Sequence, residues 1–180
     1  MFVRGEEVYN ELYIREGILL LQYTICFIKN GDEILMLNRE KSPNMGLWNG
    51  VGGKIEQGET HLQSVIRETY EETGIQLNNP TFAGEVTWLS NRGNGGMYVY
   101  IEEIPLNKKQ DFLLSTREGI LCWKKIDWLL DDLNRGVVPN IKYYLPEILN
   151  GNYNLKHQFT YENGHIINYQ RMSLFENTYS

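Results

Sequence analysis

The sequence predicts one mixed α/β domain, and three observations carry this prediction. The chain has 180 residues, and a single domain usually has ~100–200. Strand-like runs lie on both sides of a helix whose two ends are clearly marked. The sequence shows neither an internal repeat nor a low-complexity linker. We therefore expect an N-terminal extension over residues 1–17 and a single domain over residues 18–175.

Strands are expected before and after this helix. Asn30-Gly31 and Asn163-Gly164 are strong hairpin turns, and each lies between two strand-like runs. A loop rich in Gly, Asn and Pro occupies residues 42–53. The expected strands are residues 23–28, 33–37, 82–89, 97–104, 120–126, 155–161 and 165–169.

The first helix is expected over residues 60–73. Thr60 and Gln63 have the spacing of a capping box, and Gly74 is placed to end the helix. A second helix is expected over residues 140–149. The buried stripe of the first helix is expected to consist of Leu62, Val65, Ile66, Thr69 and Thr73.

The composition is that of an ordinary globular protein, with 42% hydrophobic, 12% aromatic and 22% charged residues. It excludes a disordered chain, a collagen-like repeat and a coiled-coil rod. The formal net charge of −6 argues against a surface for duplex nucleic acid, because such a surface needs a basic face. A small substrate that bears phosphate stays compatible, since a bound cation reverses the local sign of a site.

The sequence favours a cytoplasmic location. Residues 1–17 carry several charges and lack the unbroken apolar core of an export signal. The apolar stretch over residues 18–28 contains Gln22 and Thr24, and it is shorter than the ~20 residues of a membrane-spanning helix. No membrane partner is therefore expected. Cys26 and Cys122 each lie in an apolar strand-like run, which is typical of buried free thiols in a reducing compartment.

Three glutamates on the first helix are candidates for chemistry. Glu68, Glu71 and Glu72 stand at i, i+3 and i+4, so they share a face and repel one another. A hard cation such as Mg²⁺ would remove this repulsion, because it prefers carboxylate oxygens. The alternative is a solvated acidic face. Gly52-Gly53 precedes the helix, where a bare backbone can offer a carbonyl to a metal or approach a phosphate closely.

The segment from Gly53 to Ile75 resembles the Nudix box, G-x5-E-x7-R-E-U-x-E-E-x-G-U, in which U is bulky and apolar. Thr69 departs from the pattern at the first U position, although its methyl group can still pack inward. The fixed letters fall on Gly53, Glu59, Arg67, Glu68, Glu71, Glu72 and Gly74.

This resemblance implies an α/β/α sandwich with a mixed sheet and a metal-dependent hydrolase of nucleoside diphosphate derivatives. It implies that Mg²⁺, for which Mn²⁺ substitutes, is held by Glu68, Glu71 and Glu72, with the Gly52 carbonyl as a further ligand. It also implies that Arg67 is structural and pairs with a carboxylate such as Glu59. Displacement at phosphorus agrees with this reading, since it needs charge neutralisation and an activated water.

The lead-in over residues 47–54 resembles that of MutT-type 8-oxo-dGTP diphosphatases. In that group the asparagine after the tryptophan contacts the purine, so this role is carried to Asn49. Lys54, the last residue of the lead-in, is taken as a further substrate-binding residue. For Trp48 itself, packing in the loop is the favoured interpretation.

Two residues outside the box are assigned from the same resemblance. Asn140 occupies the place of a side chain that reads the edge of the oxidised guanine, and an amide offers both a donor and an acceptor. The alternative is that Asn140 only caps the second helix. Glu118 is the candidate for a fourth acid, as metal ligand or general base, with Glu102 and Glu103 as rivals.

The expected function is Mg²⁺-dependent hydrolysis of a nucleoside triphosphate to the monophosphate and pyrophosphate, with 8-oxo-dGTP as the leading substrate. An alternative is another Nudix substrate: ADP-ribose, a dinucleoside polyphosphate or an RNA 5′-triphosphate end. A third is a non-catalytic nucleotide-binding module. The chain is expected to be a monomer or a homodimer. His61, His157 and His165 share no ligand spacing, and His61 is expected to be exposed at the start of its helix.

Overall fold

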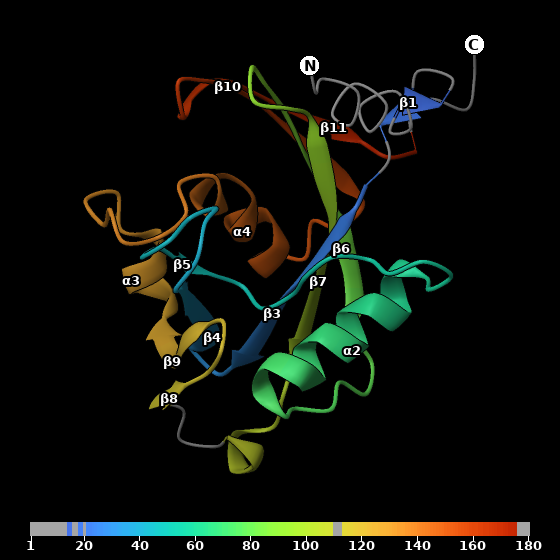
Figure 1. The fold of residues 1–180 in the computed structure, drawn as a ribbon. Coiled ribbons are helices and arrows are strands. Elements are labelled where there is room, and N and C mark those ends of the chain that lie inside the picture. The colour runs from blue at the N-terminus through green and yellow to red at the C-terminus, as the bar shows by residue number, and fades with distance from the viewer. Residues whose placement is uncertain (1–13, 16–17, 20, 110–112, 176–180) are drawn as a thin grey trace, which may run out of the picture.

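A nine-stranded mixed sheet forms the centre of the protein (Figure 1). The computed structural model describes residues 14–15, 18–19, 21–109 and 113–175. The strand order is β11-β10-β6-β7-β3-β4-β9-β8, and β5 pairs with β4 beside this path. The strands are β3 (Tyr23–Asn30), β4 (Glu33–Arg39), β5 (Trp48–Asn49), β6 (Thr81–Ser90), β7 (Gly95–Glu103), β8 (Leu113–Ser115), β9 (Gly119–Lys125), β10 (Leu155–Glu162) and β11 (His165–Ser173).

Two strand pairs in this sheet are parallel, β3 with β7 and β10 with β6, and the other pairs are antiparallel. The expected mixed sheet is confirmed. A separate two-stranded ribbon, β1 (Ile14–Arg15) and β2 (Ile18–Leu19), precedes it. Apart from β1, the expected N-terminal extension over residues 1–17 lies outside the described residues.

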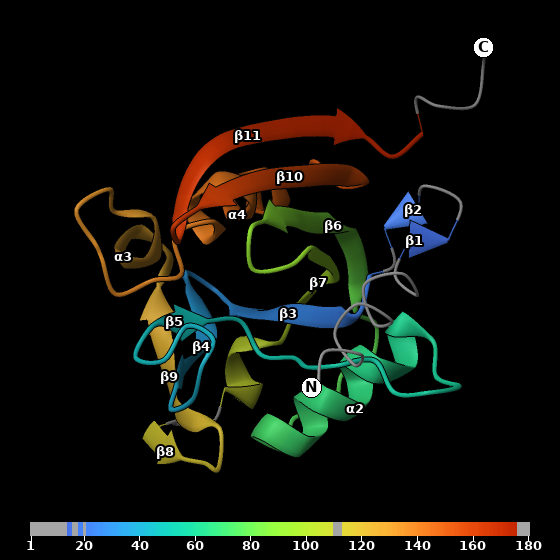
Figure 2. The ribbon, with the colours of Figure 1, turned by 45° about the horizontal axis from the view of Figure 1, so that its top comes forward.

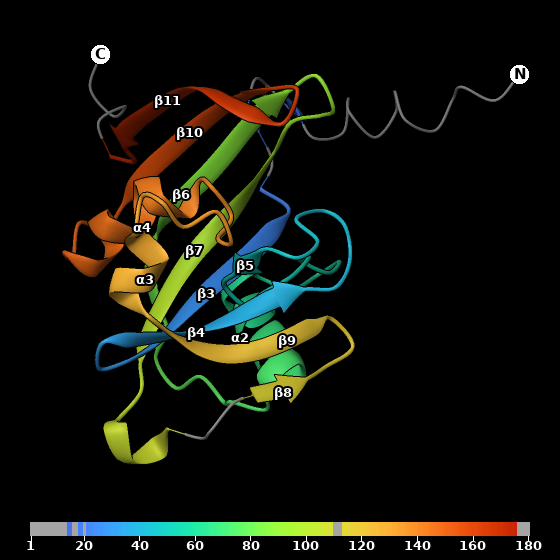
Figure 3. The same ribbon diagram turned by 90° about the vertical axis from the view of Figure 1, so that its left-hand side faces the viewer.

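Helices cover the two faces of the sheet, as expected for an α/β/α sandwich (Figures 2 and 3). The helix α2 (His61–Thr73) packs on one face over a core that includes Val51, Val65 and Leu121. The helices α3 (Ile126–Leu130) and α4 (Ile141–Leu149) pack on the other face. The core beneath them includes Phe27, Met36, Val138, Ile141, Tyr144 and Phe159.

Short elements escaped the sequence prediction. α3, β5, β8 and a 3₁₀ turn over Leu106–Lys108 were not expected, and none spans more than five residues. Elements this short carry too few residues to establish a period. Among the described residues, no helix is long and apolar enough to cross a membrane.

The two ends of α2 follow the predicted chemistry. The Thr60 hydroxyl accepts from the Gln63 backbone N–H, and the Gln63 side chain accepts from the Thr60 backbone N–H. Gly74 ends the helix with φ of 73°, a left-handed conformation that favours glycine.

The predicted buried stripe of α2 is wrong at Leu62, which is exposed, while Ser64 is fully buried in its place. The smaller side chain faces the sheet where the helix approaches β3 closely, as the contact of Ser64 with Thr24 shows.

The prediction of buried free thiols is confirmed for Cys26 but not for Cys122. Cys26 is fully buried in β3, and burial raises the pKa of its thiol far above the ordinary value. Cys122 is only half-buried in β9, where its thiol donates to the Trp123 carbonyl. The difference follows from position, because β3 lies at the centre of the sheet, whereas β9 has only the short β8 outside it.

Loss of the capping box should weaken α2. Replacing Thr60 by Ala leaves a backbone donor of the first turn without its partner, which costs ~0.5–2 kcal/mol of stability. Urea unfolding should show a lower midpoint for Thr60→Ala, whereas Gln63→Glu, which keeps the reciprocal bond, should stay near the wild type. Equal midpoints for all three proteins would contradict the assigned role of the cap.

Candidate active site

The glycine loop is fixed against β3 by backbone hydrogen bonds. Thr24 donates to the Gly53 carbonyl at 2.9 Å, and Cys26 donates to the Val51 carbonyl at 2.7 Å. Gly52 has φ of 147°, and a Cβ atom there would lie 2.2 Å from the Thr24 carbonyl oxygen. This close approach needs glycine. The loop therefore has one backbone path, set by the neighbouring strand.

Carboxylates of α2 lie directly against this loop. A Cβ atom on Gly53 would lie 2.4 Å from the Glu68 carboxyl carbon, so the carboxylate fills the space that any side chain would need. The Glu72 carboxylate accepts from the Gly52 backbone N–H at 2.8 Å. Glu68 and Glu72 are thus held on two successive residues of one backbone turn.

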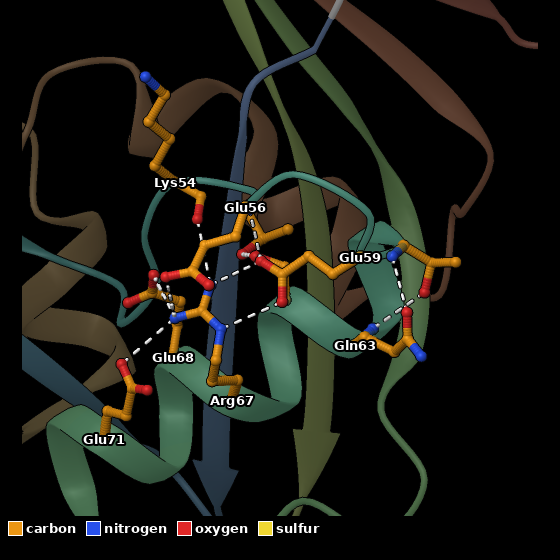
Figure 4. Close-up of polar contacts among 10 residues, drawn as sticks. Lys54, Glu56, Glu59, Gln63, Arg67, Glu68 and Glu71 are labelled. Carbon is orange, nitrogen blue, oxygen red and sulfur yellow. Dashed lines mark hydrogen bonds and ion pairs between the residues drawn. The ribbon is translucent and has the colours of Figure 1, made fainter.

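Arg67 connects the loop to the helix (Figure 4). Its guanidinium donates twice to Glu59, at 2.6 and 3.1 Å, and once to the Lys54 carbonyl at 3.2 Å. It also donates to Glu68 at 2.9 Å and to Glu71 at 3.2 Å. Because this guanidinium lies beside it, the pKa of Glu59 is lowered to about 2. The ion pair that the Nudix resemblance implies for Arg67 is present.

The negative charges of Glu72 and Glu68 are only partly compensated by neighbouring donors and cations. The pKa of Glu72 is raised to about 7, chiefly by burial. The Glu68 and Glu118 carboxylates contribute to the rise, and the Gly52 N–H and Arg39 oppose it. The pKa of Glu68 is also raised, chiefly by burial. Two glutamates in one half-buried place therefore resist ionisation together.

The chemistry of this cluster fits a hard divalent cation. All its donors are carboxylate or carbonyl oxygens, and a cation would relieve the repulsion that raises the glutamate pKa values. In the described part of the chain, however, no three His, Cys, Asp or Glu side chains converge closely enough to hold a metal ion. Glu68 and Glu71 both accept from Arg67, whereas Glu72 accepts from the Gly52 N–H, so the three helix carboxylates do not face one common point.

Glu118 lies near the cluster, and its rivals do not. The Glu118 carboxylate acts on the pKa of Glu72, and it pairs with Lys41 at 3.7 Å. Glu102 accepts instead from the backbone N–H groups of residues 78 and 79. Glu103 pairs with Lys29 at 2.7 Å. Both rivals therefore have structural partners away from the loop.

Arg39 is a further candidate site residue, which the sequence did not indicate. It ends β4, it lies close enough to Glu72 to lower that pKa, and its Nε is buried without a hydrogen-bond partner. A buried guanidinium nitrogen without an acceptor is suited to an anionic ligand. The available signal was a lone arginine at the strand end that opens the glycine-rich loop.

The lead-in residues divide between the two faces of the sheet. Asn49 pairs with Leu37, whose side chain packs on the α2 side, and the Asn49 amide oxygen accepts from the Gly50 N–H. Trp48 packs against the opposite core, as expected for a loop aromatic, with the Lys124 ammonium 4.1 Å from its ring centre. The Lys54 side chain is exposed and extends away from Arg67 (Figure 4).

Asn140 is buried at the start of α4 but does not cap it through its side chain. Its backbone is helical, and no side-chain cap hydrogen bond forms, so the capping alternative is wrong. The amide oxygen of Asn140 is buried without a partner. Its segment is joined to the lead-in, because Trp48 donates to the Gly136 carbonyl and accepts from Val138.

The expected exposure of His61 is wrong. Its ring stacks on Tyr98 with centroids 4.1 Å apart, and its Nδ1 contacts the Tyr100 hydroxyl. His61 is partly buried although it begins a helix, because its ring packs on the aromatic rings of Tyr98 and Tyr100 in β7. Burial lowers the pKa of His61. His157 is buried and bonded to the Tyr169 hydroxyl at 2.8 Å, so the described histidines form no ligand group.

Comparison with known proteins agrees with this geometry. A family model described as NUDIX domain matches residues 20–135. The Nudix hydrolase YvcI of Bacillus subtilis, itself uncharacterised, is 30% identical over 147 residues, which cover 79% of this chain and 87% of that protein. The crystal structure of the mutator MutT protein of Bacillus halodurans aligns with a TM-score of 0.70 and 27% identity, over 84% of this chain and 97% of that one.

A third relative matches only in part. The NAD-capped RNA hydrolase NudC of Haemophilus influenzae is 41% identical over 66 residues. The match covers 36% of this chain and 25% of NudC.

The raised pKa of Glu72 predicts a stability that depends on pH. A glutamate has a pKa of about 4.3 in an unfolded chain, whereas Glu72 has about 7 in the folded protein. The folded state therefore binds this proton more tightly, and the free energy of unfolding should fall as pH rises from about 4.3 to about 7. Glu72→Gln should remove much of this fall, measured by urea unfolding at pH 5 and pH 8 with a chelator present. Glu103→Gln is the matched control, and an unchanged fall in Glu72→Gln would contradict the assignment.

Proposed function

The chain belongs to the Nudix family of pyrophosphohydrolases, and we propose that it hydrolyses a nucleoside triphosphate, 8-oxo-dGTP before others, to the monophosphate and pyrophosphate. The observation that carries the proposal is the cluster of Glu68 and Glu72 on the backbone of Gly52 and Gly53. Half-buried carboxylates with raised pKa values are frequent at functional sites, which supports the proposal.

Glu68, Glu71, Glu72 and Glu118, with the Gly52 carbonyl, would hold Mg²⁺ or Mn²⁺. The bound cation would neutralise phosphate charge and lower the pKa of a water. Glu68 or Glu118 would accept the proton of the attacking water as general base. Arg39 would bind a phosphate oxygen through its unpartnered Nε.

Arg67 acts by holding the helix and loop together. Its bonds to Glu59 and to the Lys54 carbonyl fix the glycine loop on the first half of α2. The same guanidinium keeps Glu68 and Glu71 at a set separation. Preorganisation of this kind removes the reorganisation that the reaction would otherwise need.

The choice of 8-oxo-dGTP is supported by Asn140. Its buried amide oxygen is an acceptor without a donor. Guanine presents an acceptor at N7, whereas the 8-oxo form carries an N–H there. An unpartnered acceptor favours the oxidised base, because the ordinary base would leave two acceptors facing each other. Asn49 is proposed as a second contact to the purine.

A second candidate substrate is a dinucleotide pyrophosphate of the NAD type, which the 41% identity to part of NudC favours. The two candidates share the same phosphorus chemistry and differ in the group beyond the scissile bond. A hydrolysis panel with and without Mg²⁺ separates them: 8-oxo-dGTP, dGTP, ADP-ribose, NAD and NAD-capped RNA, with products resolved. Fastest release of pyrophosphate from 8-oxo-dGTP supports the first candidate, and fastest cleavage of an NAD substrate replaces it with the second.

Loss of a helix carboxylate should lower turnover strongly without unfolding the protein. Glu71→Gln and Glu72→Gln should each lower kcat by ~10²-fold or more, because they remove proposed cation ligands and leave the packing of α2 unchanged. Steady-state kinetics with Mg²⁺ and a thermal melt of each variant test this. Glu103→Gln should retain wild-type turnover, and wild-type rates in both helix variants would overturn the proposed metal site.

Removal of the Asn140 amide should lower base selectivity more than catalysis. Asn140→Ala should reduce the kcat/KM ratio of 8-oxo-dGTP over dGTP by ~10-fold or more, the typical effect of a hydrogen bond left unmade. The measurement is kcat/KM for both nucleotides in parallel. An unchanged ratio in a folded variant would show that Asn140 does not contact the base.

A further inference from the structure

The Lys124 side chain lies between two tryptophan rings. Its ammonium is 4.1 Å from the ring centre of Trp48 in β5 and 5.1 Å from that of Trp128 in α3. Among the described residues, no carboxylate lies within ion-pair distance of Lys124, whereas the next residue, Lys125, pairs with Asp32 at 2.9 Å. The two electron-rich ring faces therefore take the place of an acidic partner for this ammonium.

Gly136 lies where the two indole rings approach each other. A Cβ atom at this position would be 3.8 Å from Cδ1 of Trp48 and 3.9 Å from Cη2 of Trp128. The Gly136 N–H donates to the Asn134 amide oxygen at 2.9 Å, and its carbonyl accepts from the Trp48 N–H at 2.8 Å. The Asn134 amide nitrogen donates in turn to the Trp128 carbonyl at 2.7 Å. These contacts form a closed ring, which Lys124 completes through its two indole partners.

This ring joins the two segments that carry the proposed base contacts. Trp48 directly precedes Asn49 in the lead-in. The Trp48 carbonyl accepts from the Val138 N–H at 3.0 Å, two residues before Asn140. The two segments are far apart in the sequence and meet at Trp48, so the contacts of this residue set how far apart the two amides lie.

A second lysine fastens the same loop in a different way. The Lys142 ammonium donates to the carbonyls of Asp131 and Asn134, which ties the loop before Gly136 to α4. The contacts of Lys124 include the lead-in through Trp48, and those of Lys142 do not, in the part of the chain that the structure describes.

We infer that Lys124 is a positioning residue for substrate binding: its ammonium holds the two indole rings together and thereby places Asn49 and Asn140 for the purine. This inference rests on the proposed function, because it takes these two amides as the base contacts. Lys124 is not proposed to touch the substrate. The carboxylates of α2 lie on the other face of the sheet, so the effect of Lys124 is on binding of the base and not on the chemical step.

The test compares Lys124→Met, Lys124→Arg and Lys125→Met with the wild type in steady-state kinetics with 8-oxo-dGTP. Methionine keeps an apolar stem and removes the charge. The KM should rise by about three- to tenfold in Lys124→Met, the size expected for one cation–π contact, and kcat should change by less than about twofold. Lys124→Arg keeps a cation over the rings and should stay near the wild type. Lys125→Met loses only an exposed ion pair and should do the same.

Two further measurements separate positioning from a general loss of structure. Tripolyphosphate has no base, so its inhibition constant should be the same in Lys124→Met and the wild type within about twofold. Trp128→Leu removes one of the two rings, and its combination with Lys124→Met should raise KM by less than the product of the two single effects. Thermal melts of each variant show that it is folded.

Each other outcome overturns a specific step. An unchanged KM in a folded Lys124→Met variant would overturn the inference and leave the proposed substrate in place. An equal rise of KM in Lys125→Met, an equal weakening of tripolyphosphate, or independent effects of Lys124→Met and Trp128→Leu would also overturn it. A wild-type enzyme that does not hydrolyse 8-oxo-dGTP would overturn the proposed substrate, and the inference with it.

Discussion

The rest of the site depends on the hydrogen bonds and ion pairs of the Arg67 guanidinium. This guanidinium is the one cation bonded to both the glycine loop and the helix carboxylates among the described residues, through Glu59 and the Lys54 carbonyl on one side and Glu68 and Glu71 on the other. A buried or half-buried ion pair is weak evidence for stability when considered alone. Its value here is geometric, since a planar donor with several N–H groups sets the separation between a loop and a helix.

This arrangement places several carboxylates close together, and their mutual repulsion lowers the stability of the folded protein. Glu68 and Glu118 raise the pKa of Glu72, and burial raises the pKa of both Glu68 and Glu72. Apolar residues at these positions would pack without this repulsion. The protein tolerates the repulsion because the Gly52 N–H and Arg67 compensate part of it, and a bound cation would compensate the rest. The destabilising repulsion between carboxylates is confined to one turn of the helix and the adjoining glycine loop.

How much the sequence predicts depends on how local the physical cause is. The caps of α2 and the tail hairpin follow from residues a few positions apart, and both are present. The Arg67–Glu59 pair, which the Nudix resemblance implied, is present as well. The predicted burial of Leu62 and the predicted exposure of His61 were wrong, because the burial of these residues depends on β3 and β7, which lie far away in sequence. Arg39 was missed for the same reason, since its importance comes only from the approach of Glu72.

Asn140 and the carboxylate cluster lie on opposite sides of the sheet. The carboxylates lie on the α2 side, whereas Asn140 begins α4 on the other side. The lead-in joins them, because Trp48 bonds to the segment that precedes Asn140, and Gly52 bonds to Glu72. The backbone from Trp48 to Gly52 therefore connects the proposed base contact with the proposed cation site, and its course at Gly52 is fixed by the close approach to the Thr24 carbonyl.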